Sequence, residues 1–367
     1  MAKRLRVGVI GAGVIAQVMH LPYLRELSDR YEVVALCDLA EGNARTCATE
    51  YGVPRWFVDW RDLLREPMDA VIVVTSGNHA PIAIEAARAG LHVLVEKPMT
   101  FSVPDAAAMN AAAQAAGVVL MVGYNKRYDL AFARFREEAL AIKDARLLRV
   151  TTLESPFRPF IGHYGLPQPS PAPADVVDRL RIEDRKSIVA ALGTDDEFLC
   201  NTYQMVLLDT LVHELNTVRG VLGEPDRLDY VDLRSDSVTV MLRFGNLPVA
   251  IHWLDLPGIT RYKMEFALFA PDRRATLSFP SPFLRSAPAL LHVETGVAGS
   301  TQSWDSEEIV SYESSFKREL EAFHAWVVDG VAAATPGIDG MRDVALCQAI
   351  IASSRTGQPI DRPTAVD

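Results

Sequence analysis

The sequence is poor in the features that mark secreted, membrane-embedded or nucleic-acid-binding proteins. Its 367 residues include only four cysteines, none with C-x-x-C spacing, so neither a disulfide framework nor a thiolate metal site is indicated. No apolar run reaches the length of a membrane span. The net charge of −10, from 47 acidic and 37 basic residues, argues against a nucleic-acid partner. We therefore expect a soluble protein of a reducing compartment, the cytoplasm by default, with no membrane or nucleic-acid partner and no metal.

What the sequence does contain fits a folded chain of two domains. Hydrophobic residues make up 49% and charged residues 23%, which is ordinary for a globular protein, and the length exceeds one ordinary core. In the first part of the chain, short continuous apolar runs alternate with helical patterns. The runs predict buried strands at 5–10, 31–37, 70–74, 91–95 and 118–122, with helices at 14–27, 42–51, 80–89 and 103–116. This alternation predicts a doubly wound parallel sheet, a Rossmann domain, over residues 1–123.

The pattern changes in residues 124–367, for which we expect an α+β domain. After a helix at 130–140 and a strand at 147–153, residues 155–174 contain six prolines and predict a long surface loop. A charged piece at 178–186 precedes an apolar helix at 205–222. The next strands are joined by short links, which predicts a large, mostly antiparallel open sheet, and the expected strands are 228–233, 238–244, 249–254, 262–269 and 275–279. Helices at 314–328 and 341–354 close the domain.

The first strand runs into a G-x-G-x-x-A turn that predicts a dinucleotide site. Gly11 permits the tight turn, Gly13 lets the backbone approach a pyrophosphate, and Ala16 lets the helix lie close to the strand. Val14 and Ile15 begin that helix, whose unpaired N–H groups face the phosphates. A glycine-rich turn without a ligand is the alternative, but the turn lies between a strand and a helix, as a dinucleotide site requires.

Asp38 ends the second predicted strand, at the position expected to hold the hydroxyls of the adenosine ribose. A carboxylate there binds the free diol of NAD and repels the 2′-phosphate of NADP. We therefore expect NAD, with NADP as the alternative. Asp38 could also serve as a turn or cap residue, and the two roles are compatible.

Three segments resemble the glucose–fructose oxidoreductase / inositol dehydrogenase / MocA family. They are the Glu96-Lys97-Pro98 sequence, the turn from Thr75 to His79, and the sequence from Gly123 to Tyr128. The resemblance implies a Rossmann domain followed by a domain with an open sheet that packs between subunits, hence a homodimer or homotetramer. It also implies a sugar or polyol substrate, and it adds these residues to the cofactor site: Thr75, Ser76, His79, Glu96, Lys97 and Asn125.

Lys97 is the first candidate catalytic residue. It follows the fifth predicted strand, at the carboxyl edge where open parallel sheets bind ligands. Its ammonium group can hydrogen-bond the reacting oxygen and stabilise a developing alkoxide. In proteins similar to this one, the Lys–Pro bond that follows is often cis. The alternative is a surface lysine beside a structural glutamate.

Asp209 and His213 are the other candidate catalytic residues. They are four residues apart in a predicted helix and share one face among apolar neighbours, where polar groups are costly to bury without a role. The spacing resembles the family's D-x-x-x-H-x-x-D motif, which makes His213 the general base and gives Asp209 a substrate-binding or orienting role. Asn216 stands where the motif has its last aspartate. A satisfied core histidine is the alternative, and a metal site with Glu214 is disfavoured because that side chain points about 100° away.

These features predict an oxidoreductase that transfers a hydride between NAD and a secondary alcohol or ketone of a sugar, glycoside or cyclic polyol. The alternatives are an NADP-dependent ketosugar reductase, an NAD-retaining glycosidase that acts through a keto-sugar, and a dinucleotide sensor without catalysis. His252, Trp253 and Tyr262 could line a sugar pocket or be ordinary sheet residues. The proline-rich loop could cover the substrate or form an arm between subunits.

Overall fold

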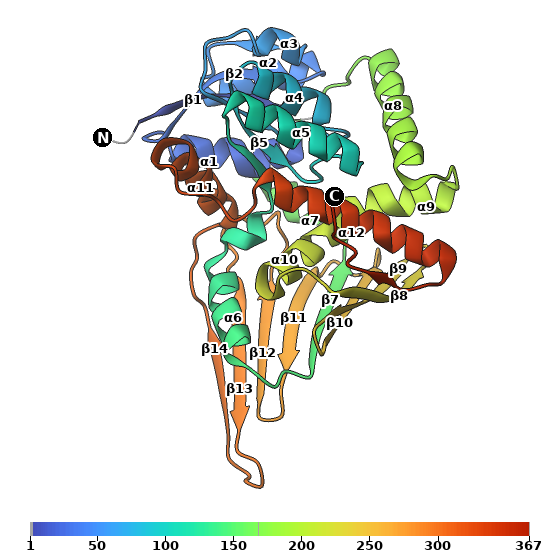
Figure 1. Ribbon diagram of the computed structural model, residues 1–367. Helices are drawn as coiled ribbons and strands as arrows, with labels where there is room; N and C mark the ends of the chain where they lie inside the picture. The colour runs from blue at the N-terminus through green and yellow to red at the C-terminus, as the bar shows by residue number, and fades with distance from the viewer. Residues whose placement is uncertain (1–2, 168, 367) are drawn as a thin grey trace. The chain divides into compact units, whose positions relative to one another are not determined.

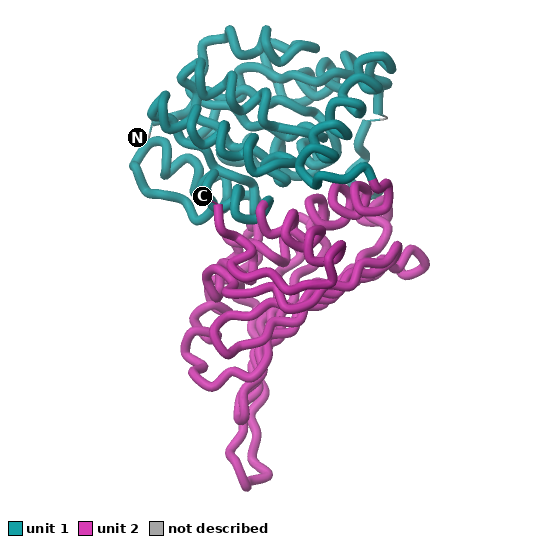
Figure 2. The backbone as a smooth tube through the Cα atoms, turned by 45° about the vertical axis from the view of Figure 1, so that its right-hand side comes forward, with its two compact units in different colours: residues 1–124, 162–195, 316–344 teal, residues 125–161, 196–315, 345–367 magenta. Residues whose placement is uncertain are grey.

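A computed structural model describes residues 3–167 and 169–366, which form two compact units (Figure 2). The first unit comprises residues 1–124, 162–195 and 316–344, and the second comprises 125–161, 196–315 and 345–367. The expected division at residue 123 differs from this one because two later segments of the chain pack on the first unit. No helix among the described residues is long and apolar enough to cross a membrane.

The first unit contains a six-stranded parallel sheet in the order β3-β2-β1-β4-β5-β6 (Figure 1). This is the doubly wound order of dinucleotide-binding domains, so the predicted Rossmann architecture is confirmed. The strands are β1 Leu5–Ile10, β2 Tyr31–Cys37, β3 Trp56–Phe57, β4 Ala70–Val73, β5 His92–Glu96 and β6 Leu120–Gly123. β1 lies between β2 and β4, so the loops that follow these two strands flank its carboxyl end.

Helices connect these strands, and their ends follow local capping chemistry. The first connection is a π-helical turn, η1 (Ala16–His20), that continues as α1 (Leu21–Glu26). The others are α2 (Glu41–Tyr51), α3 (Trp60–Leu63), α4 (Ala80–Arg88) and α5 (Val103–Ala116). The hydroxyl of Ser102 accepts from the N–H of Asp105 at the start of α5, and Gly117 ends that helix with φ of 67°.

Two further segments complete the first unit. The charged piece expected at 178–186 is part of a long helix, α8 (Ala174–Leu192), of which only Ile188 and Leu192 are buried. The helix α11 (Ser315–Asp329) lies almost wholly in the first unit, and α12 (Gly337–Thr356) begins there and ends in the second. The described part of the proline-rich stretch contains the short turns α7 (Arg158–Ile161), which belongs to the second unit, and η3 (Gly162–Tyr164), which belongs to the first.

The second unit contains a nine-stranded sheet in the order β14-β13-β12-β11-β7-β10-β9-β8-β15. Its strands are β7 Leu147–Glu154, β8 Arg227–Leu233, β9 Ser237–Phe244, β10 Leu247–Asp255, β11 Lys263–Phe269, β12 Arg273–Phe279, β13 Leu290–Gly296, β14 Ser303–Glu308 and β15 Ile360–Asp361. The mostly antiparallel open sheet is therefore confirmed. The consecutive strands β10 and β11 do not pair with each other, because β7 lies between them, parallel to β10 and antiparallel to β11.

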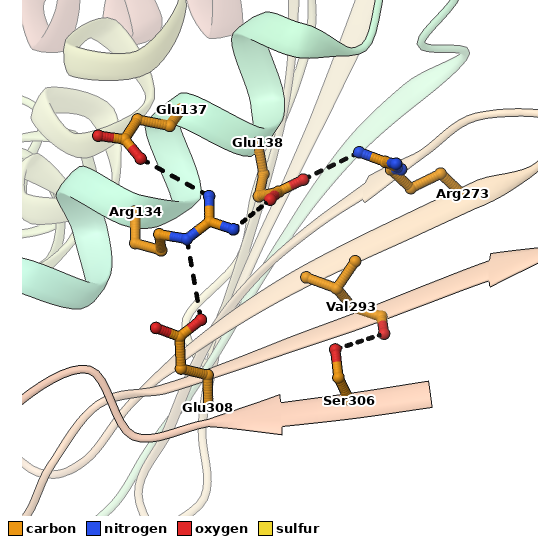
Figure 3. Close-up of polar contacts among 7 residues, drawn as sticks. All are labelled: Arg134, Glu137, Glu138, Arg273, Val293, Ser306 and Glu308. Atoms are coloured by element: carbon orange, nitrogen blue, oxygen red, sulfur yellow. Dashed lines mark hydrogen bonds and ion pairs between the residues drawn. The ribbon is translucent and has the colours of Figure 1, made fainter. Parts of the chain in front are cut away.

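The helix α6 (Leu130–Ala141) is tied to the far end of this sheet by a network of charges (Figure 3). The guanidinium of Arg134 lies 2.5 Å from Glu138 and 3.8 Å from Glu308 of β14, and Glu138 lies 3.0 Å from Arg273 of β12. Exposed pairs of this kind contribute little singly, but the network fixes α6 across three strands. The remaining helices of the unit are η2 (Asn125–Tyr128), α9 (Glu197–Asn201), the π-helix η4 (Thr202–Leu211) and α10 (Val212–Leu222).

Candidate active site

The glycine-rich turn after β1 has the shape that a dinucleotide needs. Gly11 has φ of +108°, and a Cβ there would lie 2.6 Å from the backbone of Val74, so only glycine fits. At Gly13 a Cβ would meet no heavy atom within 4 Å, and this exposed backbone is open to a ligand. Ala16 is fully buried beneath the helix that starts with the half-buried Val14 and Ile15. The N–H groups of that first turn have no intrahelical partners and are available to phosphate oxygens.

Asp38 joins the end of β2 to this turn. One of its carboxylate oxygens accepts from the N–H of Ala12 at 2.7 Å, and the other accepts from the N–H of Ala40 at 2.8 Å. An ionised carboxylate has about four acceptor positions, so each oxygen keeps one for a ribose hydroxyl. The turn role and the ribose-binding role of Asp38 are therefore compatible in this geometry.

The buried ring of His79 joins the loops that follow β4 and β5. Its Nε2 lies 2.7 Å from the carbonyl oxygen of Thr75, and its Nδ1 lies 2.8 Å from that of Pro98. Burial lowers the pKa of His79, so its neutral ring donates to one carbonyl at a time. The Lys97–Pro98 peptide bond is cis. His79 thus holds in place the half-buried Thr75 and the exposed Ser76 on one side and the lysine loop on the other.

Glu96 anchors the backbone of Lys97. Its Oε2 accepts from the Lys97 N–H at 3.1 Å, and its Oε1 lies 2.7 Å from Nε2 of His20, which is 1% exposed. Burial alone would raise the pKa of Glu96, but the hydrogen bond and charge of His20, together with Lys97, lower it below its usual value. The carboxylate therefore stays ionised, and a Cβ at Gly123 would lie 3.2 Å from it. His20 could not be predicted as part of the site, because it is 76 residues from its partner and belongs to no recognised spacing.

Asp209 and His213 lie on either side of the junction between η4 and α10 in the second unit. Asp209 is exposed and His213 is half-buried, while the leucines around them are buried. A π-helix adds residues to each turn and is often found at functional sites. Nothing in the sequence pattern predicted the π-helical form. The pairing of these two residues with Lys97, which belongs to the first unit, stays a prediction.

Two residues of the family-like motifs are fixed inside the second unit. The backbone carbonyl and side-chain oxygen of Asn216, 1% exposed, each lie 3.3 Å from Nη1 of Arg127, which is consistent with an amide oxygen replacing a carboxylate oxygen as acceptor. The amide of Asn125 donates to the hydroxyl of Ser315 at 2.9 Å. Asn125 thus lies in a different unit from the glycine-rich turn, and its contact with a cofactor stays a prediction.

A buried polar cluster lies under α10. Glu214 is 0% exposed, and its Oε1 accepts from the hydroxyl of Thr152 on β7. Its Oε2 has no hydrogen-bond partner among the described residues. Burial raises the pKa of Glu214 to about 7, against the hydrogen bond of Thr152 and the charge of Lys126, and burial also raises the pKa of Glu154. Among residues 3–167 and 169–366, no group of three or more His, Cys, Asp and Glu side chains could hold a metal ion.

The sheet residues suggested as pocket lining are divided between environments. His252 is half-buried, and its Nδ1 lies 3.2 Å from the hydroxyl of Thr239 on the neighbouring strand, an ordinary sheet pair. Trp253 is 5% exposed, pairs in register with Thr152, and has an indole N–H without a partner among the described residues. Burial, and then the charges of Glu214 and Glu154, raise the pKa of Tyr262. Trp253 and Tyr262 therefore border the buried polar cluster.

Comparisons with known proteins agree with this geometry. A family model described as an oxidoreductase family with an NAD-binding Rossmann fold, that of the glucose–fructose oxidoreductase / inositol dehydrogenase / MocA proteins, matches residues 5–124. The myo-inositol 2-dehydrogenase of Thermotoga maritima is 25% identical over 352 residues, which cover 92% of each chain. Residues 5–124 thus match this family. The chain is an NAD(P)-dependent oxidoreductase, as the turn at Gly11 and the sequence at Lys97 predicted.

Other dehydrogenases are similar to this chain over nearly its whole length. The D-xylose 1-dehydrogenase (NADP(+)) 2 of Haloferax volcanii is 25% identical over 363 residues, which cover 96% of this chain and 98% of that one. A solved structure of levoglucosan dehydrogenase in complex with NADH has a TM-score of 0.75 and 18% identity, and covers 98% of this chain and 100% of that one. This last likeness shows that the fold is shared.

Proposed function

We propose that this oxidoreductase interconverts a secondary alcohol and the matching ketone on a sugar, glycoside or cyclic polyol, with NAD as its preferred cofactor. The preference for NAD rests on Asp38, whose carboxylate holds the glycine-rich turn and keeps acceptor capacity for a ribose diol. A 2′-phosphate would bring a second negative charge to this carboxylate, which disfavours NADP. The substrate class is supported by relatives named as dehydrogenases of inositol and xylose.

Three side chains of this protein would carry the reaction. The bound nicotinamide supplies or accepts the hydride. Lys97 donates a hydrogen bond to the reacting oxygen and stabilises the alkoxide that forms during oxidation. His213 takes the hydroxyl proton and returns it in the reverse direction, which suits an imidazole near neutral pH. Asp209 binds a neighbouring hydroxyl or orients the imidazole. The single observation that carries the proposal for Lys97 is the buried Glu96–His20 pair that fixes its backbone.

The test is a panel of inositols, aldoses and glycosides incubated with NAD or NADP while nicotinamide absorbance is followed. We expect NAD to be reduced by a polyol or sugar, and the variants Lys97→Ala and His213→Ala to lose the activity. The exposed Lys143 and the hairpin residue His292 provide the matched controls Lys143→Ala and His292→Ala, which should keep it. Wild-type activity in Lys97→Ala or His213→Ala would contradict the assignment. Conversion of a glycoside without added cofactor would favour the glycosidase alternative.

We also propose that the protein forms a homodimer or homotetramer through the open sheet. The large exposed side chains on this sheet, Tyr230 on β8 and Trp304 on β14, support the proposal because such residues are enriched at interfaces. Sedimentation analysis of the wild type and of Tyr230→Lys tests it. A monomer at all concentrations would contradict it.

A further inference from the structure

We propose that residues 169–187, here called the strap, complete the dinucleotide site and hold the nicotinamide dinucleotide in place between turnovers. The strap comprises the end of the proline-rich stretch and most of α8. It belongs to the first compact unit although it lies between β7 and α9 in the sequence. The inference rests on dinucleotide binding by this unit and does not depend on the identity of the substrate.

One end of the strap is fixed beside the adenosine side of the expected site. The N–H of Ser170 donates to the side-chain oxygen of Asn43 at 2.9 Å. A Cβ at Gly42 would lie 2.0 Å from the hydroxyl oxygen of Ser170, so only glycine allows the strap to lie against the start of α2. Gly42 and Asn43 follow Asp38 by a few residues, in the loop and first turn after β2.

The other end of the strap is fixed to the loops after β4 and β5. An oxygen of Asp184 accepts from the N–H of Asn78 at 3.3 Å, and the other lies 2.7 Å from where a Cβ of Gly77 would be. The hydroxyl of Ser187 donates to Asp105 at 3.4 Å, at the start of α5. Gly42 in the first turn of α2 and Gly77 in the loop after β4 thus make room for two strap side chains, which indicates a shaped contact.

The sheet order determines what lies between these two ends. β1 is flanked by β2 and β4, and the strap is hydrogen-bonded to the first turn of α2, which follows β2, and to the loop that follows β4. It therefore spans the carboxyl end of β1, where the glycine-rich turn faces the pyrophosphate. The helix α8 contains four acidic and four basic residues, so it brings no net charge against the phosphates. A dinucleotide bound at Gly13 would have the strap across its path of departure.

Amide hydrogen exchange of the wild-type protein gives the first test. With NADH bound, we expect the amides of residues 170–187 to exchange more slowly than in the free protein, because the strap and the ligand hold one another. The loop around Gly258 in the second unit serves as the internal reference. Protection of the glycine-rich turn by NADH with no change in the strap would overturn the proposal while leaving dinucleotide binding intact.

Dissociation kinetics of NADH give the second test. In the variant Gly42→Ala/Asp184→Ala, the new methyl group at position 42 displaces one end of the strap, and the loss of Asp184 removes the hydrogen bond at the other end. Alanine at position 42 has a higher helix propensity than glycine and so does not weaken α2 itself. Its matched control is Gly258→Ala/Asp178→Ala, with an open glycine and an exposed aspartate of the same helix. Loss of two hydrogen-bonded contacts predicts NADH release at least about tenfold faster than in the wild type, with the control unchanged. If the variant has the melting temperature of the wild type and releases NADH at the same rate, the strap proposal is overturned. If the wild type binds no NADH, both the strap proposal and dinucleotide binding are overturned.

Discussion

Nε2 of His20 lies 2.7 Å from Oε1 of Glu96, and both side chains are buried in the first unit. The Nδ1 atom of the same imidazole is buried without a hydrogen-bond partner among the described residues. The other carboxylate oxygen of Glu96 accepts from the backbone N–H of Lys97. This chain of contacts predicts that His20 positions Lys97 through Glu96.

Replacing His20 tests this relationship. In His20→Leu the buried carboxylate loses its donor, so we expect the pKa of Glu96 to rise and the Lys97 loop to loosen. A small displacement at a reacting group predicts a kcat lower by about tenfold or more, with the KM for NAD little changed. His20→Gln keeps an N–H donor and should recover most of kcat, which a purely structural role would not require. Wild-type kcat in His20→Leu would contradict the positioning role.

The depressed pKa of Glu96 also gives this site a pH signature. A carboxyl group whose pKa is lowered on folding stabilises the protein above its unfolded pKa, and the stabilisation is lost as pH falls through the folded value. The melting temperature of the wild type should therefore exceed that of His20→Leu most clearly at neutral pH. The difference should shrink as the pH falls below the usual range of a glutamate. A difference that grows on acidification would contradict the assignment of charge to Glu96.

Asp38 should control the choice of cofactor. Asp38→Ser removes the carboxylate that we propose binds the ribose diol, while a hydroxyl remains to accept from the Ala40 N–H. We expect the ratio of kcat/KM for NAD over NADP to fall by about tenfold to a hundredfold, since hydrogen bonds to a charged group contribute about 1.5–3 kcal/mol. The exposed Asp29→Ser is the control. An unchanged ratio would show that NAD is selected elsewhere in the site.

Glu214 should make the second unit less stable as the pH rises. Its folded pKa of about 7 lies above the ordinary glutamate value of 4.5, so the protonated form stabilises the fold at acidic pH. That stabilisation is lost between these values as the pH increases. Glu214→Gln places an uncharged side chain at this buried position. Its free energy of unfolding should exceed that of the wild type by an amount that grows to about 3 kcal/mol between pH 5 and pH 8. Thermal melts of both proteins and of the exposed control Glu137→Gln measure this, and a gain at pH 5 alone would contradict it.

The parallel sheet of the first unit could be predicted because each of its longer strands is a short, continuous apolar run. β1 and β2 were predicted with the bounds that the structure shows. β14 could not, because all six of its residues are exposed and all but Trp304 are polar, and it is held by pairing with β13. The helix α8 likewise could not be predicted from an apolar pattern, since only two of its side chains are buried. Its contact with the loop after β4 could not be predicted because Asp184 and its partners Gly77 and Asn78 are more than a hundred residues apart.

In the candidate site, too, contacts between residues far apart in the sequence could not be predicted. Motifs within one segment, such as the glycine-rich turn and the sequence around Lys97, carry their own spacing and could be recognised. The partners that fix them come from remote segments: His20 for Glu96, and Thr152 for Glu214. Single-sequence patterns contain no signal for such pairs. The substitution of Asn216 for an aspartate could be noticed, but its bond to Arg127 needed the structure.

The most direct test of the central claim is to follow a deuterium atom from substrate to cofactor. A polyol or sugar that the protein oxidises would be labelled on its carbinol carbon, and the NADH formed would be examined by NMR. We predict that the deuterium appears at C4 of the nicotinamide ring, and that Lys97→Ala abolishes the transfer while Lys143→Ala preserves it. NADH that forms without deuterium, or transfer that continues unchanged in Lys97→Ala, would contradict the proposed reaction or its catalytic lysine respectively.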